Sequence, residues 1–245
     1  MIFDRMRELL LDQAIQGKLV PQESDEVVVD QIGTKPGVVP FAIPDSWHWV
    51  TLESISSVIS KGTTPKGGKS AYSPSGIGFV RVNNFGDDGQ IDTREMKFID
   101  EKVHQGELKR SVLEADDVLV SIAGTLGRTI VVRESDLPLN VNQAVSFIRL
   151  HKNEANSWYV HLAISSPSIQ KRLRSQVKVT AIPNLTLQII RECVIPLPPL
   201  GEQTRIVAKL EEAFAEIDRA EKAYEELQTL AGVLRGQILQ KAIQG

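Results

Sequence analysis

A glycine-rich stretch holds the residues whose spacing comes closest to a phosphate-binding motif. It reads Gly62-Thr-Thr-Pro65-Lys-Gly-Gly68-Lys-Ser70 and resembles a P-loop, whose backbone N–H groups and lysine hold nucleotide phosphates. The spacing does not fit, because one residue more than a P-loop has separates Gly62 from Gly68. Pro65 also lacks the backbone N–H that such a loop presents to phosphate. A flexible basic loop is the better interpretation, and a nucleotide-binding enzyme that uses the loop from Gly62 to Ser70 remains an alternative.

Other side chains that catalyse reactions or bind metals are scattered along the sequence. Four histidines stand in unrelated contexts, without the spacing of a metal-binding pair: His48, His104, His151 and His161. Asp92, Glu95 and Lys97 resemble the carboxylate–lysine set of a nuclease, but such a triplet carries little information where 24% of residues are charged. The single cysteine, Cys193, excludes an internal disulfide and a multi-cysteine zinc site. We therefore predict no catalytic set and no metal site.

The charge of the chain is distributed unevenly, although its sum is only −3. Residues 1–45 carry 4 basic and 8 acidic side chains, and residues 193–245 carry 6 and 8. Residues 46–192 carry 18 basic and 15 acidic side chains, so a basic middle lies between two acidic ends. Local charge matters because salt screens electric fields within about 10 Å. The middle of the chain is therefore a candidate for binding nucleic acid.

Two stretches of this basic middle, 54–86 and 155–191, contain no acidic residue. Acid-free basic surfaces with interleaved aromatic residues are typical of proteins that follow a phosphate backbone. We expect contacts to DNA phosphates from Lys61, Lys66, Lys69, Arg81, Lys171, Arg172, Arg174 and Lys178. Amide side chains can bond a base edge, but residues of these types are equally common in turns. The candidates for base contacts are Thr63, Thr64, Tyr72, Asn83, Asn84, Asn142 and Gln143.

A mixed fold must position these residues. Strand patterns occur at 47–52, 78–82, 118–122, 129–133, 144–150 and 185–195, and helix patterns at 157–164 and 168–176. They do not alternate regularly, so we predict the α+β class: one globular DNA-binding domain over 46–198 with a meandering mixed sheet. Residues 1–45 are predicted to form a short N-terminal helix and a linker. No apolar run approaches the roughly 20 residues of a membrane span, and the N-terminus is a poor signal peptide, so we expect a cytoplasmic protein.

Residues 199–245 are predicted to form a long helix that pairs with a second helix. From Glu202 to Ala242 the sequence has no proline, and apolar or aromatic residues recur every seven positions in two registers. A helix of about 60–65 Å cannot bury such a stripe against one compact domain. We therefore predict a coiled-coil dimer seam, which also acts as a spacer, made by Ile206, Leu210, Ile217, Tyr224, Leu227, Leu234 and Ile238.

The two ends of the chain repeat one another. Residues 7–17 read RELLLDQAIQG and residues 235–245 read RGQILQKAIQG, with six of eleven positions identical. Chance similarity between two amphipathic helices is the alternative, but it does not account well for AIQG at both helix ends. The pattern indicates one unit of a tandem array that is cut inside its repeat.

Several motifs together resemble the DNA specificity subunit of type I restriction–modification systems. The C-terminal segment is similar to that family's conserved helix in Ile195-Pro-Leu-Pro-Pro-Leu-Gly-Glu-Gln203, and the N-terminal segment to its conserved repeat in Gln16-Gly-Lys-Leu-Val-Pro21. Three further motifs resemble its target recognition domain: Ile43-Pro-Asp-Ser-Trp47, Lys61-Gly-Thr-Thr-Pro65 and the run from Asp117 to Gly127. The resemblance covers nearly the whole chain.

The resemblance implies a non-catalytic subunit that reads DNA. A usual member has two recognition domains and two long helices, whereas this chain has one of each, so we expect a half-length form. Two copies would pair with antiparallel helices, bind double-stranded DNA at a bipartite inverted-repeat site, and dock methyltransferase subunits and, through them, restriction subunits. No cofactor is expected on this chain, since S-adenosylmethionine, ATP and Mg would belong to those partners. A coiled-coil scaffold that binds protein remains a further alternative.

Overall fold

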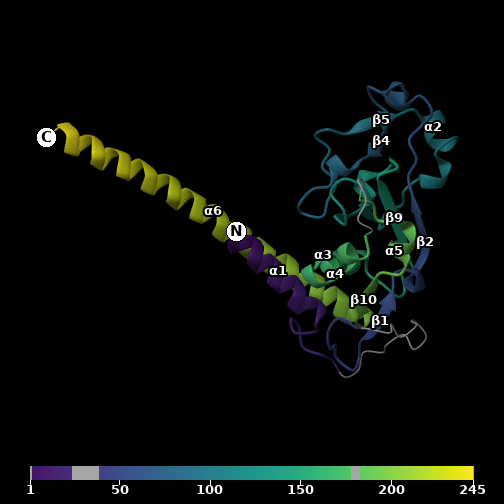
Figure 1. Cartoon of the computed structure of the whole chain (residues 1–245), viewed down its shortest axis with the longest axis horizontal. Coiled ribbons are helices and arrows are strands. Elements are labelled where there is room, and N and C mark those ends of the chain that lie inside the picture. Colours follow the sequence, from purple (N-terminus) through teal and green to yellow (C-terminus); the bar gives the residue numbers. More distant parts are fainter. Residues whose placement is uncertain (1, 24–38, 178–182, 245) are drawn as a thin grey trace.

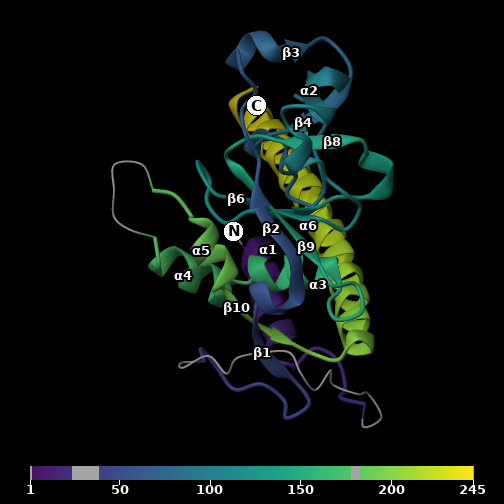
Figure 2. The same cartoon turned by 90° about the vertical axis from the view of Figure 1, so that its right-hand side faces the viewer.

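The structure, a computed structural model, describes residues 2–23, 39–177 and 183–244. A body of strands and short helices carries one long helix that projects away from it (Figure 1). That helix, α6 (Leu200–Gln244), is 45 residues long, close to the predicted segment. The shorter α1 (Ile2–Ile15) lies along its first half, as both views show (Figure 2). In the described part of the chain, no helix is both long and apolar enough to cross a membrane.

The first sheet of the body is antiparallel and has the order β2-β9-β6-β7. Its members are β2 (Ser56–Lys61), β9 (Val145–Leu150), β6 (Val118–Ser121) and β7 (Thr129–Val131). All residues of β6 are buried, as its continuous apolar run predicts. The strand β2 was not predicted, because three serines interrupt its apolar pattern.

The second sheet is mixed and has the order β3-β5-β4-β8. Its members are β3 (Tyr72–Ser73), β5 (Lys97–Ile99), β4 (Ile77–Val80) and β8 (Leu139–Val141), and the β4–β8 pair is parallel. A two-stranded ribbon of β1 (His48–Thr51) and β10 (Val194–Leu197) completes the strands. The α+β class is confirmed, but the strands form two sheets and a ribbon rather than one sheet.

Four further helices belong to the body: α2 (Glu101–Gln105), α3 (Ser157–Ser165), α4 (Pro167–Ser175) and α5 (Leu187–Arg191). The Asn156 side chain caps α3 by accepting from two backbone N–H groups, and Pro167 opens α4. The strand expected at 185–195 is wrong in its first half. There the Thr186 hydroxyl accepts from the Ile189 N–H and starts α5, a choice that a short Leu/Ile run does not reveal.

The first half of α6 is covered within its own chain. The helix α1 runs antiparallel to it: the Phe3 ring lies 5.9 Å from the Tyr224 ring, and Arg7 donates to Asp218 and Glu221, both at 2.6 Å. Three predicted seam residues are therefore buried, at 1%, 0% and 5% exposure: Ile206, Leu210 and Ile217. The first two belong to the main core. For these three the expected seam is wrong, because α1 and the body supply the partner that the periodicity requires.

The second half of α6 projects from the body without cover (Figure 1). Its seam residues are 64%, 49% and 67% exposed, in the order Leu227, Leu234 and Ile238, and Tyr224 at the boundary with the first half is 52% exposed. Leu230, Val233, Leu239 and Ile243 are exposed as well. We call residues 200–224 the proximal half of α6 and residues 225–243 its distal half.

Two polar residues at the start of α6 fix the helix to the body. Glu202 is 1% exposed, and its carboxylate accepts from Trp47 Nε1 at 2.9 Å and from Gln22 Nε2 at 2.6 Å. Trp47 and Glu202 belong to two of the motifs that carry the family resemblance. The motif at the start of the domain thus binds the motif at the start of the long helix.

The neighbouring Gln203 makes a second set of contacts and is 0% exposed. Its Oε1 accepts from the Asn156 N–H at 2.7 Å, and its Nε2 donates to the carbonyls of Glu154 and Pro198 at 3.1 and 2.9 Å. A buried amide with all these partners is costly to displace. The direction in which α6 leaves the body is therefore fixed by buried hydrogen bonds at its first turn.

Candidate nucleic-acid interface

Several strands of the body end at one edge. Gly62 donates its N–H to Val145 at 3.0 Å, and the Asn142 N–H donates to Val80 at 3.0 Å. The carbonyl of Ile122 accepts from Leu185 at 3.0 Å. These bonds gather the loops after β2, β4, β6 and β8. We call residues 62–64, 81–83, 123–126, 142–144 and 183–184 the loop edge.

The loop edge carries part of the predicted base-reading set. Thr63, Asn83 and Gln143 are exposed there, and Thr64 is half-buried. Asn142 Oδ1 accepts from the Ala144 N–H at 3.1 Å, so this side chain also shapes the turn. The structure thus brings candidates from three separate segments of the sequence to one edge of the body.

Two other base-reading candidates make contacts within the body. Asn84 is 0% exposed; its Oδ1 accepts from the Arg81 N–H at 3.0 Å and its Nδ2 donates to the Asp92 carbonyl at 2.9 Å. The half-buried Tyr72 ring packs 5.8 Å from the Phe79 ring beside a small core cluster. Burial and internal partners leave Asn84 no surface for a base, so this prediction is wrong, whereas the half-buried Tyr72 keeps part of its ring exposed and stays a prediction.

The predicted phosphate contacts of the first basic stretch have different surroundings. Lys61 and Lys66 are exposed, and the Lys66 N–H donates to the Glu107 carboxylate at 2.8 Å. Arg81 is half-buried and donates to the Glu95 carbonyl at 2.7 Å. The side chain of Lys69 and the whole of Lys178 lie outside the described residues.

The second basic stretch lies on α4 and is tied to the loop edge. Lys171 and Arg174 are exposed on this helix. Gln170 Nε2 donates to the Gly127 carbonyl at 2.7 Å, and Arg174 donates to Gln170 Oε1 at 3.3 Å. The cations of α4 are therefore held close to the turn that follows β6. Arg172 is half-buried and lies near the Cys193 thiol.

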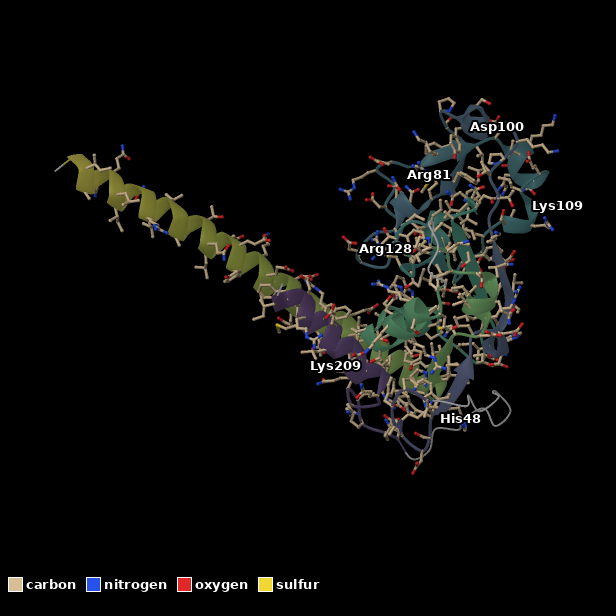
Figure 3. All side chains as sticks on the ribbon, viewed as in Figure 1. His48, Arg81, Asp100, Lys109, Arg128 and Lys209 are labelled. Atoms are coloured by element: carbon tan, nitrogen blue, oxygen red, sulfur yellow. The ribbon has the colours of Figure 1, made fainter. Side chains whose placement is uncertain are left out.

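The sequence-based set omits one cation at this surface, Arg128. Its guanidinium donates to the Phe85 carbonyl and to Asp87, both at 2.6 Å. Arg128 and Arg81 lie on the side of the body that faces the projecting α6, whereas Lys109 lies on the far side (Figure 3). Acidic residues on both sides of Arg128 in sequence, Asp117 and Glu134, hid it from a search for acid-free stretches. Its position directly after the turn from Asp117 to Gly127 is the signal that was available.

The glycine-rich loop does not present its N–H groups as a nucleotide site does. Gly62 donates its N–H to Val145, and Gly68 donates to Pro65 at 3.0 Å. A Cβ at Gly62 would lie 2.0 Å from the Val141 carbonyl, so this glycine allows two backbones to approach. This geometry counts against the nucleotide-binding alternative.

A cavity of about 690 Å³ lies between the body and the proximal half of α6. Arg7, Asp87, Arg128, His161 and Asp218 are among its lining residues, so charges of both signs surround it. Burial lowers the pKa of His161 to about 4, and its Nδ1 lies 2.8 Å from the Thr129 hydroxyl. This neutral histidine is a structural side chain. Within the described ranges, no three or more His, Cys, Asp or Glu residues group as metal ligands.

The comparisons with known proteins account for this combination of loops and long helix. The family model described as "Type I restriction modification DNA specificity domain" matches residues 44–229. This chain belongs to that family. The match takes in the loop edge, the buried contacts of Trp47 with Glu202, and the proximal half of α6.

Relatives in the specificity-subunit family are about twice as long as this chain. It is 29% identical over 254 residues to the type I restriction enzyme EcoBI specificity subunit of Escherichia coli, which covers 100% of this chain and 50% of the relative. It is 25% identical over 256 residues to the EcoKI specificity subunit of Escherichia coli (strain K12), covering 100% and 49%. The chain thus spans about half the length of the curated relatives it matches.

Solved structures of specificity subunits have the same fold. The crystal structure of the HsdS subunit from Thermoanaerobacter tengcongensis superposes with a TM-score of 0.58 at 23% identity, covering 88% of this chain and 46% of that one. A chain from a structural study of type I R-M complex assembly gives a TM-score of 0.57 at 21% identity, covering 92% and 50%. The predicted family resemblance is confirmed.

Proposed function

We propose that this chain recognises DNA as a half-length specificity subunit of a type I restriction–modification complex. The observation that carries the proposal is the family match across both the loop edge and the start of α6. The three segments keep the roles predicted above: residues 46–198 bind DNA, residues 199–245 act as spacer and dimerisation helix, and residues 1–45 form the N-terminal helix and linker. The loop edge of one copy would read a few base pairs.

DNA binding is supported by exposed polar and cationic side chains. Thr63, Asn83 and Gln143 would contact base edges, while Lys61, Lys171 and Arg174 would contact phosphates. Methyl transfer and cleavage would belong to methyltransferase and restriction subunits, which would hold S-adenosylmethionine, ATP and Mg. The chain itself would be non-catalytic.

A direct test measures the affinity for duplex DNA against salt concentration. Replacing both α4 cations, K171A/R174A, is expected to flatten the slope of log affinity against log salt by about 2, because each neutralised phosphate contributes about 0.9. The matched control K109A/R110A removes the same charge from exposed residues, and Lys109 lies on the far side of the body. An equal loss of slope in both variants would contradict the assigned surface. A wild-type chain that binds no duplex even at low salt would overturn the function.

Pairing of two copies through α6 is supported by the uncovered distal half. Apolar side chains that are about half to two-thirds exposed along an isolated helix need a partner. Residues 211–226 carry seven acidic and two basic side chains, whereas residues 227–243 carry two basic and no acidic ones. An antiparallel partner sets these opposite charges side by side, and a parallel partner does not. Two identical recognition domains related by a two-fold axis would bind an inverted-repeat site, with base pairs between the half-sites that neither domain contacts.

The variant L227D tests the pairing. A charge placed in the seam is expected to weaken the dimer at least tenfold, because the carboxylate loses its water on association. The control T229D adds the same charge on the opposite face of the helix. Light scattering over a range of micromolar concentrations gives both masses. If L227D stays as dimeric as T229D, the distal half is not the seam.

A further inference from the structure

All four repeated residues within α1 touch the rest of the chain, and Phe3, Leu10 and Asp12, which are not repeated, touch it as well. Arg7 binds Asp218 and Glu221, and Leu11 packs against the main core. Ala14 and Ile15 are each 1% exposed and belong to that core. The repeat keeps all four of these α1 residues. Positions where the two copies differ include the exposed Glu8, Leu9 and Gln13 of α1.

The matching residues at the end of α6 are exposed to solvent instead of packed against the chain. Leu239 is 55% exposed and Ile243 is 85% exposed, and Arg235 and Ala242 are exposed as well. The distal half thus carries a copy of the face with which α1 binds, on a helix that projects into solvent. An amphipathic helix that repeats a binding face can bind the same partner surface.

We propose that the distal half of α6 in one copy occupies, on a second copy, the place that α1 holds in the structure. Arg235 would then bind the partner's Asp218 and Glu221, and Ala242 and Ile243 would enter the core site of the partner's Ala14 and Ile15. This inference rests on the pairing proposed above and specifies its register. The occupant is a second copy of this chain, because only the repeat carries this face.

The exchange conserves most of the contacts of α1. Each copy would release its own α1 and receive from its partner a helix that repeats Arg7, Leu11, Ala14 and Ile15, which is the condition under which domain swapping is inexpensive. It would lose the Phe3 contact with Tyr224, because Ala231 stands at the matching position, and it would replace Asp12, which accepts from the Ser168 N–H, by Gln240. In addition, the basic distal residues would lie along the acidic residues 211–226 of the partner. The two-fold axis would then pass near Leu227, since Arg235 of one copy lies opposite Glu221 of the other.

A second arrangement keeps α1 in place and pairs only the uncovered residues. Its two-fold axis would pass near Leu234, at the middle of the distal half. The two registers differ in which residues approach one another between copies. Cysteine pairs with a short bismaleimide linker can therefore separate them.

The deciding variant is E221C/R235C, with R235C alone as its control, because the second arrangement brings the two Arg235 positions together beside its axis and would link R235C to itself. Within one chain these positions are 14 residues apart on a continuous helix, or about 21 Å, so a short linker joins them only between copies. The control R7C/E221C reports α1 bound to its own chain. L234C reports the arrangement that leaves α1 in place. Burial raises the pKa of Cys193 to about 12, which keeps this native thiol unreactive.

We expect E221C/R235C to give covalent dimers that R235C alone does not give, and R7C/E221C to give less internal cross-link as protein concentration rises. Dimers from L234C and from R235C alone, with no further dimer from E221C/R235C, would overturn the exchange and leave the pairing intact. A chain that remains monomeric by light scattering would overturn both. Duplex binding measured on the same samples reports separately on DNA recognition, so the failure of the register and the failure of the function are distinguishable.

Discussion

The two halves of α6 have the same heptad pattern and opposite surroundings. In the proximal half, Leu210 is 0% exposed because α1 and the body cover it, whereas in the distal half Leu227 is 64% exposed. The periodicity of a seam thus predicts that a partner exists, and it does not say whether the partner belongs to the same chain. Here α1 and the body supply the partner of the proximal half, and the pairing proposed above would supply that of the distal half.

The largest expected difference between the halves is in folding stability. L210A should lower the free energy of unfolding by about 2–5 kcal/mol, because it leaves a cavity in the core. L227A removes the same atoms from an exposed site and should change it by less than about 0.5 kcal/mol in the monomer. Urea denaturation at a concentration that favours monomers measures both. Equal losses would mean that the distal half is covered as well.

Acid should lower the folding stability of the body that packs against the proximal half. The pKa of His161 is about 4 in the folded chain, against an ordinary value of 6.5. Since the unfolded chain binds this proton first, stability from a neutral His161 is present above pH 6.5 and is lost as the pH falls toward 4. The loss amounts to about 3 kcal/mol. Thermal melts between pH 7 and 4 should show a smaller acid loss in H161Q than in the wild type, and equal losses would contradict the assignment.

A smaller effect is expected at the attachment of α6. W47F removes the indole N–H that donates to Glu202 and leaves a buried carboxylate short of one partner. The expected cost is about 1–3 kcal/mol. W49F is the matched control, because Trp49 is half-buried and packs on the Phe41 ring 4.9 Å away. A cost no larger for W47F than for W49F would mean that the bond contributes little to holding the helix.

Local patterns predicted much of the fold. The helix patterns at 157–164 and 168–176 predicted α3 and α4, and the seven-residue apolar repeat predicted α6. The strands β4, β6, β7 and β9 follow from apolar runs. The strand β2 and the helix α5 were not predicted, because the pairing of β2 with β9 and the cap at Thr186 override weak local preferences.

The candidate site was predicted only in part. Thr63 and Gln143 reach one surface because distant strands end together, which no local pattern shows. Asn84 has side-chain groups that could bond a base but is fully buried, and burial depends on the whole fold. Arg128 was hidden by the acidic residues near it in sequence, although its guanidinium reaches the Phe85 carbonyl across the fold.

The hydrogen bonds of Glu202 and Gln203 fix the angle at which a long helix leaves the body. A helix of 45 residues is about 67 Å long, so tilting its first turn by about 5° would move its far end by about 6 Å. Along DNA that is nearly two base-pair steps of about 3.4 Å. In a paired assembly the angular tolerance of this joint would decide how sharply one spacing is preferred over the next. Two buried side chains at the first turn of α6 would thereby control how precisely the spacing along DNA is set tens of ångströms away.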